Sequence, residues 1–279
     1  MMARAACACG LPVAATVHSL WHQASRPIRL SARLVGWRRW PVAWSAVSNA
    51  AASPVLDILG RGPVSVVPNG VDRDAWTLPG RARDPKRVVI ASVMRMVGRK
   101  RPQALLAMLA ALRAHVPDDV RLEAAVIGDG PQRAGLAADV RRLGLNGWVT
   151  LPGAMSRADI RERYRDVDLY VAPATLESFG IAALEARCAG LPVIAYRRTG
   201  IADFIDTEVN GLLVDDDRSM IEAMRRLSTD AQLRTEIARR NHMSAPVASW
   251  ERVLADCEQL YQRAHALSRA DRPRASTGR

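Results

Sequence analysis

A chain of 279 residues, 49% of them hydrophobic, can bury one full domain core and part of a second. It contains no apolar run of about 18 residues, which excludes a helix that spans a bilayer. The net charge of +12 is uneven, because residues 1–56 contain six arginines and no Asp or Glu. This balance favours an anionic partner such as a nucleotide diphosphate, an anionic lipid surface or nucleic acid, although the arginine-rich composition of a GC-rich genome would produce it too.

The start of the chain predicts a cytoplasmic protein. Residues 1–15 resemble a signal peptide only faintly, since they lack a strongly basic start, and Gly10-Leu11-Pro12 leads directly into a strand-like run. The cysteines have neither metal-ligand nor disulfide-framework spacing, so we expect reduced thiols at Cys7, Cys9, Cys188 and Cys257.

Few regular elements are predicted before residue 88. Their expected bounds are strands Val13–Val17, Val42–Val47 and Val64–Val67 and the helix Ala50–Leu59. Two or three strands are too few for a Rossmann-like sheet, so we expect residues 1–72 to be a partial domain whose upstream part is missing. Pro79, Gly80 and Pro85 make Arg73–Lys86 a predicted linker.

From residue 88 onward, short apolar runs alternate with amphipathic stretches, which predicts an α/β domain with a parallel sheet over residues 87–245. The expected strands are Val88–Val93, Arg121–Ile127, Trp148–Leu151, Leu169–Ala172, Pro192–Ala195 and Gly211–Val214. The expected helices are Pro102–His115, one ending at Leu143, others starting at Ser156 and Gly180, and a helical tail from Asp217 with breaks near Thr229 and Ala245. Ser156 and Asp159 form a plausible capping pair, and residues 268–279 are expected to be disordered.

Ligands of open parallel sheets bind beyond the carboxyl ends of the strands, and three of the strand-to-helix loops carry unusual residues. The first contains Arg95 and Lys100, two cations with Gly98 between them. Fixed cations at such a place would stabilise the negative charge that builds on a diphosphate leaving group. The alternative is a solvated pair of loop charges. The second loop, Gly128-Asp129-Gly130-Pro131, permits close approach to a ligand but could be an ordinary turn.

The third loop carries two carboxylates around a helix start at Gly180. Glu177 precedes this helix and Glu185 lies within it among apolar neighbours, where a carboxylate is costly to bury unless it is hydrogen-bonded. A pair of sugar or ribose hydroxyls would satisfy it. The alternative is a salt bridge to an arginine such as Arg187 or Arg197.

The segment from Glu177 to Ala186, with its Glu-x7-Glu spacing, closely resembles the donor-site signature of the family 4 glycosyltransferases, which have the two-Rossmann-domain (GT-B) fold. The resemblance extends over most of the chain. The matching segments are Val47–Asn49, Val66–Asp72, Arg95 with Lys100, Gly128–Pro131, Leu151–Gly153, Asn210–Val214 and Trp250–Tyr261.

The resemblance implies a retaining enzyme that moves a hexosyl unit from a UDP- or GDP-sugar to a glycan or glycolipid, with no metal and no cofactor. Arg95 and Lys100 would hold the diphosphate, and Glu177 would bind the transferred sugar. The remaining donor residues would be Phe179 and Gly180 through backbone N–H groups, Glu185 at the ribose, and the nucleotide loops at Gly128, Asp129, Gly130 and Gly153. His18 would approach the reacting sugar from the first domain. The helix at residues 246–267 would return to that domain.

Two departures from the family pattern leave alternatives open. The family's N-terminal Gly-rich loop has no counterpart here, and Arg101-Pro102 follows Lys100 where Gly is commoner. A non-catalytic or truncated nucleotide-sugar-binding remnant is therefore the second interpretation, and a nucleotide-sugar epimerase of the GT-B group is the third. A nucleic-acid partner is not expected, because no recognition motif accompanies the charge.

The segment Trp21–Trp44 interleaves tryptophans with arginines. Its members are Trp21, Trp37, Trp40 and Trp44, with Arg26, Arg29, Arg33, Arg38 and Arg39. This composition suits an anionic membrane interface or a lipid-linked acceptor, and a peripheral position at the inner face of a membrane would follow. Packing of a Rossmann helix against its sheet would explain it equally well.

Overall fold

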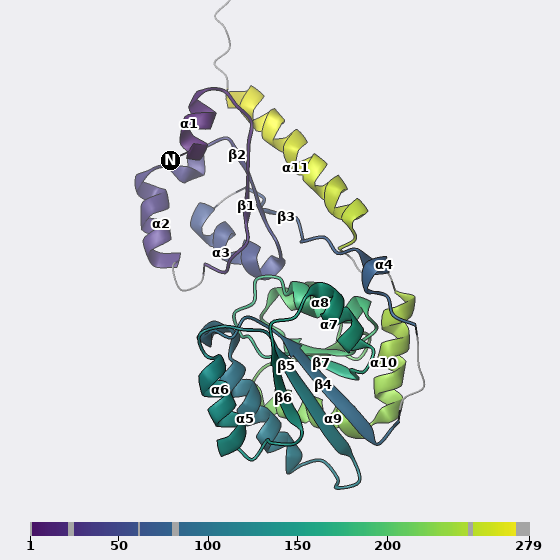
Figure 1. Cartoon of the computed structure of the whole chain (residues 1–279). Coiled ribbons are helices and arrows are strands. Elements are labelled where there is room, and N and C mark those ends of the chain that lie inside the picture. The colour runs from purple at the N-terminus through teal and green to yellow at the C-terminus, as the bar shows by residue number, and fades with distance from the viewer. Residues whose placement is uncertain (1, 22–24, 61, 80–83, 245–247, 272–279) are drawn as a thin grey trace, which may run out of the picture. The chain divides into compact units, whose positions relative to one another are not determined.

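The computed structural model describes residues 2–21, 25–60, 62–79, 84–244 and 248–271. The chain folds as two compact units, each with its own sheet. The first unit is Met1–Gly70 with Ala248–Arg279, and the second is Val71–Val247 (Figure 1). No helix of the described part is long and apolar enough to cross a bilayer.

The first unit is built on three parallel strands in the order β1 (Val13–Val17), β2 (Val42–Ala46) and β3 (Ser65–Val66). Helices α1 (Met2–Ala8), α2 (Ser25–Leu34) and α3 (Asn49–Leu59) and the 3₁₀ turn η1 (Trp37–Arg39) complete its N-terminal part. Ser48 caps α3 by accepting a hydrogen bond from the Ala51 N–H. Helix α2 was not among the predicted elements and lies within the segment Trp21–Trp44.

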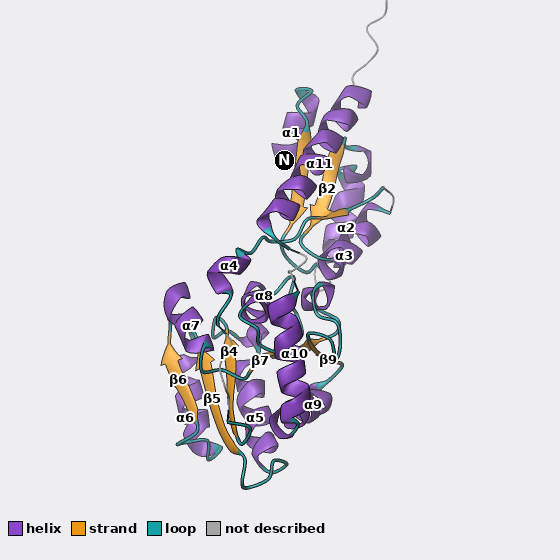
Figure 2. Cartoon of the chain, turned by 90° about the vertical axis from the view of Figure 1, so that its right-hand side faces the viewer, coloured by secondary structure: helices purple, strands orange, loops and turns teal. Residues whose placement is uncertain are grey.

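The long C-terminal helix α11 (Trp250–Asp271) lies along β1 and β2 (Figure 2). Val253, Leu260 and Ala264 of α11 form a small core with Ala43 and Val67. Residues 268–271, expected to be disordered, are the last turn of α11, where Ser268 donates a hydrogen bond to the Gly10 carbonyl at 2.9 Å. Residues 272–279, also expected to be disordered, lie outside the described residues.

Four of the tryptophans of the first unit, Trp21, Trp37, Trp40 and Trp44, form one cluster. The Trp37 ring lies 6.4 Å from Trp21, 6.1 Å from Trp40 and 5.8 Å from Trp44, measured between centroids. All four side chains are half-buried. This arrangement favours packing as the role of the tryptophans. Within the segment Trp21–Trp44, the side chains of Leu30, Leu34 and Val35 face solvent.

The second unit contains a six-stranded, wholly parallel sheet in the order β6-β5-β4-β7-β8-β9. Its strands are β4 (Arg87–Val93), β5 (Arg121–Ile127), β6 (Val149–Gly153), β7 (Leu169–Ala172), β8 (Val193–Tyr196) and β9 (Gly211–Val214). The chain winds outward from β4 on one side and from β7 on the other. The topological switch point, where such sheets open a crevice for a ligand, therefore lies between β4 and β7.

Helices cover both faces of this sheet (Figure 1), as expected for right-handed crossovers. Their bounds are α5 (Pro102–Arg113), α6 (Arg133–Arg142), α7 (Arg157–Tyr164), α8 (Ile181–Cys188), α9 (Asp217–Thr229) and α10 (Ala231–Met243), with 3₁₀ turns η2 (Gly98–Lys100) and η3 (Gly200–Asp203). Leu105, Leu109 and Leu112 of α5 are fully buried in the main core. Helix α7 begins with the predicted capping box of Ser156 and Asp159.

The segment Arg73–Lys86, expected to be a linker, contributes structure to the second unit. It forms the short helix α4 (Arg73–Trp76), and Trp76 and Leu78 are buried. The Trp76 ring packs 5.9 Å from that of Tyr164. Proline and glycine spacing indicated the irregular backbone here but could not reveal that one aromatic side chain anchors it. Residues 80–83 lie outside the described residues.

Candidate donor site

The loops that leave β4 and β7 carry the charged residues singled out in the sequence. Arg95 and Lys100 follow β4, and Glu177 follows β7. Because β4 and β7 are neighbours in the sheet and run in the same direction, their carboxyl ends open at the same edge. The strand order thus places these residues at the switch point.

Lys100 and Glu177 are in contact across this switch point. The Lys100 ammonium donates a hydrogen bond to the Glu177 carboxylate, and their side chains are 22% and 16% exposed. The two residues lie far apart in the sequence, so only the strand order can bring them together. The contact places a cation beside the carboxylate that was expected to bind the sugar.

The charges of Glu177 and Glu185 both raise the pKa of one buried phenol, that of Tyr170. Tyr170, on β7, is buried beneath the site, and its hydroxyl donates to the Val93 carbonyl at 3.1 Å. Burial raises the pKa of Tyr170, and the negative charges of Glu177 and Glu185 raise it further.

A salt bridge engages Glu185, but not with the arginines that the sequence suggested. Its carboxylate accepts a hydrogen bond from Arg157 at 2.5 Å. Arg187 instead donates to the Ser244 hydroxyl at 3.4 Å, and Arg197 lies 3.4 Å from Asp215. Burial raises the pKa of Glu185, while the charge and hydrogen bond of Arg157 act against that rise.

The loops expected to meet the nucleotide form a continuous hydrogen-bonded rim with the Arg95 loop. The Met96 N–H donates to the Asp129 carbonyl at 2.8 Å, and the Gly128 N–H donates to the Gly153 carbonyl at 2.8 Å. Gly128 has a φ of 134°, and a Cβ there would overlap the Met94 carbonyl oxygen. Only glycine permits this close approach of two loops.

The start of α8 is fixed by Phe179 and Gly180. Gly180 has a φ of 91°, and a Cβ at this position would collide with the Ile201 side chain. Phe179 is buried against Phe204, with ring centroids 5.5 Å apart. The Gly200 N–H donates to the Glu177 carbonyl at 2.9 Å and so holds the loop from its other side. The result is a rigid helix start directly after Glu177.

Arg95 and His18 complete the predicted set. Arg95 is exposed, and its side chain forms no ion pair with any residue that the structure describes. His18 is exposed in the loop that directly follows β1, in the first unit. Its expected role at the reacting sugar remains a prediction.

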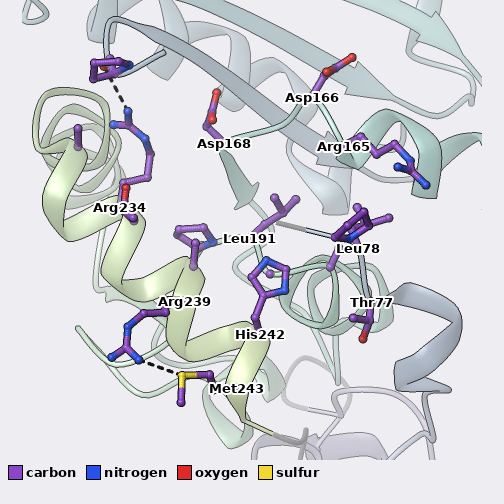
Figure 3. A pocket seen from close by; sticks show the side chains of 18 of the residues that line it. Thr77, Leu78, Arg165, Asp166, Asp168, Leu191, Arg234, Arg239, His242 and Met243 are labelled. Carbon is purple, nitrogen blue, oxygen red and sulfur yellow. Dashed lines mark hydrogen bonds between the residues drawn. The ribbon is translucent and has the colours of Figure 1, made fainter. Parts of the chain in front are cut away.

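A hollow of about 1090 Å³ lies elsewhere in the second unit (Figure 3). Its walls include Pro85, Asp168 and Pro192, which precede β4, β7 and β8, so it opens at the amino ends of the strands. Its polar groups hold the fold together: Asp168 accepts from the Val89 N–H at 2.8 Å, and Arg234 donates to the Leu227 carbonyl at 2.6 Å. This hollow is distinct from the switch-point site.

Similarity to known proteins agrees with this architecture. The D-inositol 3-phosphate glycosyltransferase of Kineococcus radiotolerans is 33% identical over 246 residues, which cover 78% of this chain and 56% of that protein. The solved structure of Anabaena HepE with UDP and glucose has a TM-score of 0.73 at 21% identity and covers 94% of this chain and 73% of its own. Staphylococcus aureus TarM has a TM-score of 0.72 at 19% identity and covers 89% and 50%.

The fold is that of the GT-B glycosyltransferases. Within this class, the model of the family "Glycosyl transferases group 1" matches residues 78–242, and the chain belongs to that family. The chain spans between 36% and 56% of the length of the first curated relatives that it matches.

Proposed function

We propose that this chain binds the donor of a retaining hexosyltransferase that uses a UDP- or GDP-sugar and transfers the sugar to a glycan or glycolipid. The observation that carries the proposal is the contact between Lys100 and Glu177 at the switch point of the second sheet. A sugar joined to a nucleoside diphosphate needs a cation for its phosphates and carboxylates for its hydroxyls, and this site supplies both.

In the proposed reaction, the bond between the anomeric carbon and the β-phosphate oxygen breaks, and its electron pair stays on the phosphate. The acceptor hydroxyl oxygen forms the new bond to the anomeric carbon, and its proton passes to the departing phosphate. Attack on the face from which the phosphate leaves retains the configuration. Arg95 and Lys100 would stabilise the charge that grows on the phosphate. Glu177 would orient the sugar, and His18 would approach it from the first unit.

UDP is the nucleotide to test first, because Anabaena HepE was solved with UDP and glucose. The curated relatives are named for D-inositol 3-phosphate, which suggests a polar, phosphorylated acceptor. The arginine-rich first unit would suit such an acceptor, or an anionic membrane that presents a lipid-linked one.

Nucleotide binding and donor turnover test the proposal. We expect UDP or GDP to bind in calorimetry, and Glu177→Ala to lower donor hydrolysis or transfer roughly a hundredfold, the scale of losing a group that orients the reacting sugar. UDP affinity should be kept in this variant or rise, because Lys100 loses its competing carboxylate. Glu222→Ala is the control, since Glu222 lies exposed on α9 and pairs with Arg225.

The other interpretations give different results in the same experiments. UDP binding without transfer or donor hydrolysis would favour a non-catalytic nucleotide-sugar-binding protein. A changed sugar in the absence of acceptor would identify an epimerase. A Glu177→Ala variant that turns over donor at the wild-type rate would contradict the proposed site.

A further inference from the structure

The residue after Lys100 has an uncommon backbone conformation. Arg101 has a φ of 57° and a ψ of 43°, the left-handed region that glycine adopts easily. Among the described residues, Glu208 is the only other non-glycine with a positive φ. Arg101 ends the turn η2, and Pro102 begins α5 immediately after it. An arginine here must be held by contacts that glycine would not need.

Those contacts are made by the Arg101 side chain. Its guanidinium forms a two-pronged ion pair with the Asp217 carboxylate, with N–O distances of 2.9 and 2.7 Å. It also donates to the Tyr196 hydroxyl at 2.8 Å and to the Pro173 carbonyl at 3.3 Å. The Tyr196 hydroxyl in turn donates to Asp217. This planar, multiply bonded arrangement is specific to arginine.

The partners of Arg101 come from the other side of the switch point. Pro173 begins the loop that carries Glu177, Tyr196 ends β8, and Asp217 begins α9. Arg101 therefore ties the loop after β4 to the loop after β7, next to the place where Lys100 meets Glu177. Because Asp217 already neutralises the guanidinium, Arg101 is suited to hold other groups in place rather than to bind a phosphate itself.

We propose that Arg101 is a positioning residue for Lys100: its contacts with Asp217, Tyr196 and Pro173 fix the backbone from which the Lys100 ammonium reaches the terminal phosphate of a nucleoside diphosphate. This inference rests on the proposed donor site. It assigns a role to the Arg101 side chain, which supplies an anchor to a turn that would otherwise depend on the backbone alone.

The test compares the binding of UDP and UMP, which differ by the phosphate that Lys100 would meet. Lys100→Gln should weaken the binding of UDP roughly tenfold, which is the effect of losing one charge-assisted hydrogen bond. The affinity for UMP should be unchanged. Arg101→Gly keeps the left-handed backbone accessible but removes the anchor. It should lower the UDP/UMP affinity ratio roughly three- to tenfold, as expected for coupled neighbours. Asp217→Asn should have the same effect.

A double variant and a matched control make the result decisive. In the Lys100→Gln background, Arg101→Gly should cause no further loss in the ratio. Glu208→Gly is the control, because Glu208 also combines a positive φ with an ion pair, to Arg226, outside the site. The proposal is overturned if Arg101→Gly weakens the binding of UDP and UMP equally or leaves both affinities unchanged. It is also overturned if Arg101→Gly lowers the UDP/UMP affinity ratio further in the Lys100→Gln background. Failure of the wild-type chain to bind either nucleotide would count against the donor site instead.

Discussion

Both carboxylates of the proposed donor site are paired with a cation from another loop or helix. Glu177 accepts a hydrogen bond from Lys100, and Glu185 accepts one from Arg157. The pairing limits the cost of placing two negative charges in a partly buried site. A bound donor would bring hydroxyls to the same carboxylate oxygens, so binding should exchange some of these contacts rather than fill an unpaired site.

We predict that removing the Arg157 side chain makes UDP affinity depend more strongly on pH. Burial raises the pKa of Glu185 and Arg157 lowers it, so Arg157→Ala should raise it further. A protonated carboxyl accepts ribose hydroxyls poorly, so UDP affinity of the variant should fall below that of the wild type at acidic pH and recover as pH rises. Calorimetry between about pH 5 and about pH 8 would show the shift.

The surroundings of Glu185 do not titrate in that range. Burial raises the pKa of Tyr164 and Tyr170, and it raises the pKa of Cys188 to about 11. Arg165→Ala is the control, because Arg165 ends the same helix and pairs with the exposed Glu162. An unchanged pH profile in Arg157→Ala would show that Arg157 does not govern the ionisation of Glu185.

Among the elements, α2 presents the surface best suited to an anionic membrane. Leu30, Leu34 and Val35 are 61%, 79% and 42% exposed. Arg33 and Arg39 line a shallow hollow of about 590 Å³ together with Leu34 and Val35. Apolar side chains beside cations can enter a headgroup layer while the cations meet lipid phosphates. The tryptophans first considered for this role pack mainly on one another.

Vesicle sedimentation tests this surface. We expect the chain to pellet with anionic vesicles at low salt. Leu34→Glu should weaken that binding roughly fivefold or more, because it removes one apolar contact and adds a negative charge whose repulsion by the lipid surface costs about 1 kcal/mol. Leu254→Glu on α11 is the control, because Leu254 is 62% exposed in the same unit. Failure of the wild-type chain to pellet would remove the membrane from the proposal.

At the scale of the whole molecule, two units have separate cores. Val253, Leu260 and Ala264 of α11 belong to the core of the first unit, whereas the six-stranded sheet and its helices form that of the second. A ligand stabilises only the unit that binds it. Calorimetric unfolding should therefore show two transitions, and UDP should raise the midpoint temperature of only one of them.

Leu260→Ala should identify the other transition. Truncating this buried leucine should lower the free energy of unfolding of the first unit by about 2–5 kcal/mol. It should therefore lower the midpoint temperature of the transition that UDP leaves unchanged, while UDP affinity is kept. Leu254→Ala, at an exposed position of the same helix, should change neither transition. A single transition that both UDP and Leu260→Ala shift would show that the units unfold together.

Local sequence patterns were enough to predict the second sheet and the loops of its candidate site. The strands Arg121–Ile127, Leu169–Ala172 and Gly211–Val214 were predicted at their observed bounds, because parallel strands buried on both faces appear as short apolar runs between turns. The same reasoning located Arg95, Lys100 and Glu177 after strand ends. The bounds of a strand and the residues that follow it depend mainly on residues adjacent in the sequence, so a local pattern is enough to predict them.

Which side chains contact one another could not be predicted from these local patterns. Arg157 rather than Arg187 pairs with Glu185, and Arg101 pairs with Asp217. The Trp37 ring packs against the other three tryptophans of its cluster. Each contact joins segments brought together by strand order and register or by the packing of helices on a sheet. Local propensity carries no information about such pairings, because many partners of the same charge or size are available along the chain until the fold selects one.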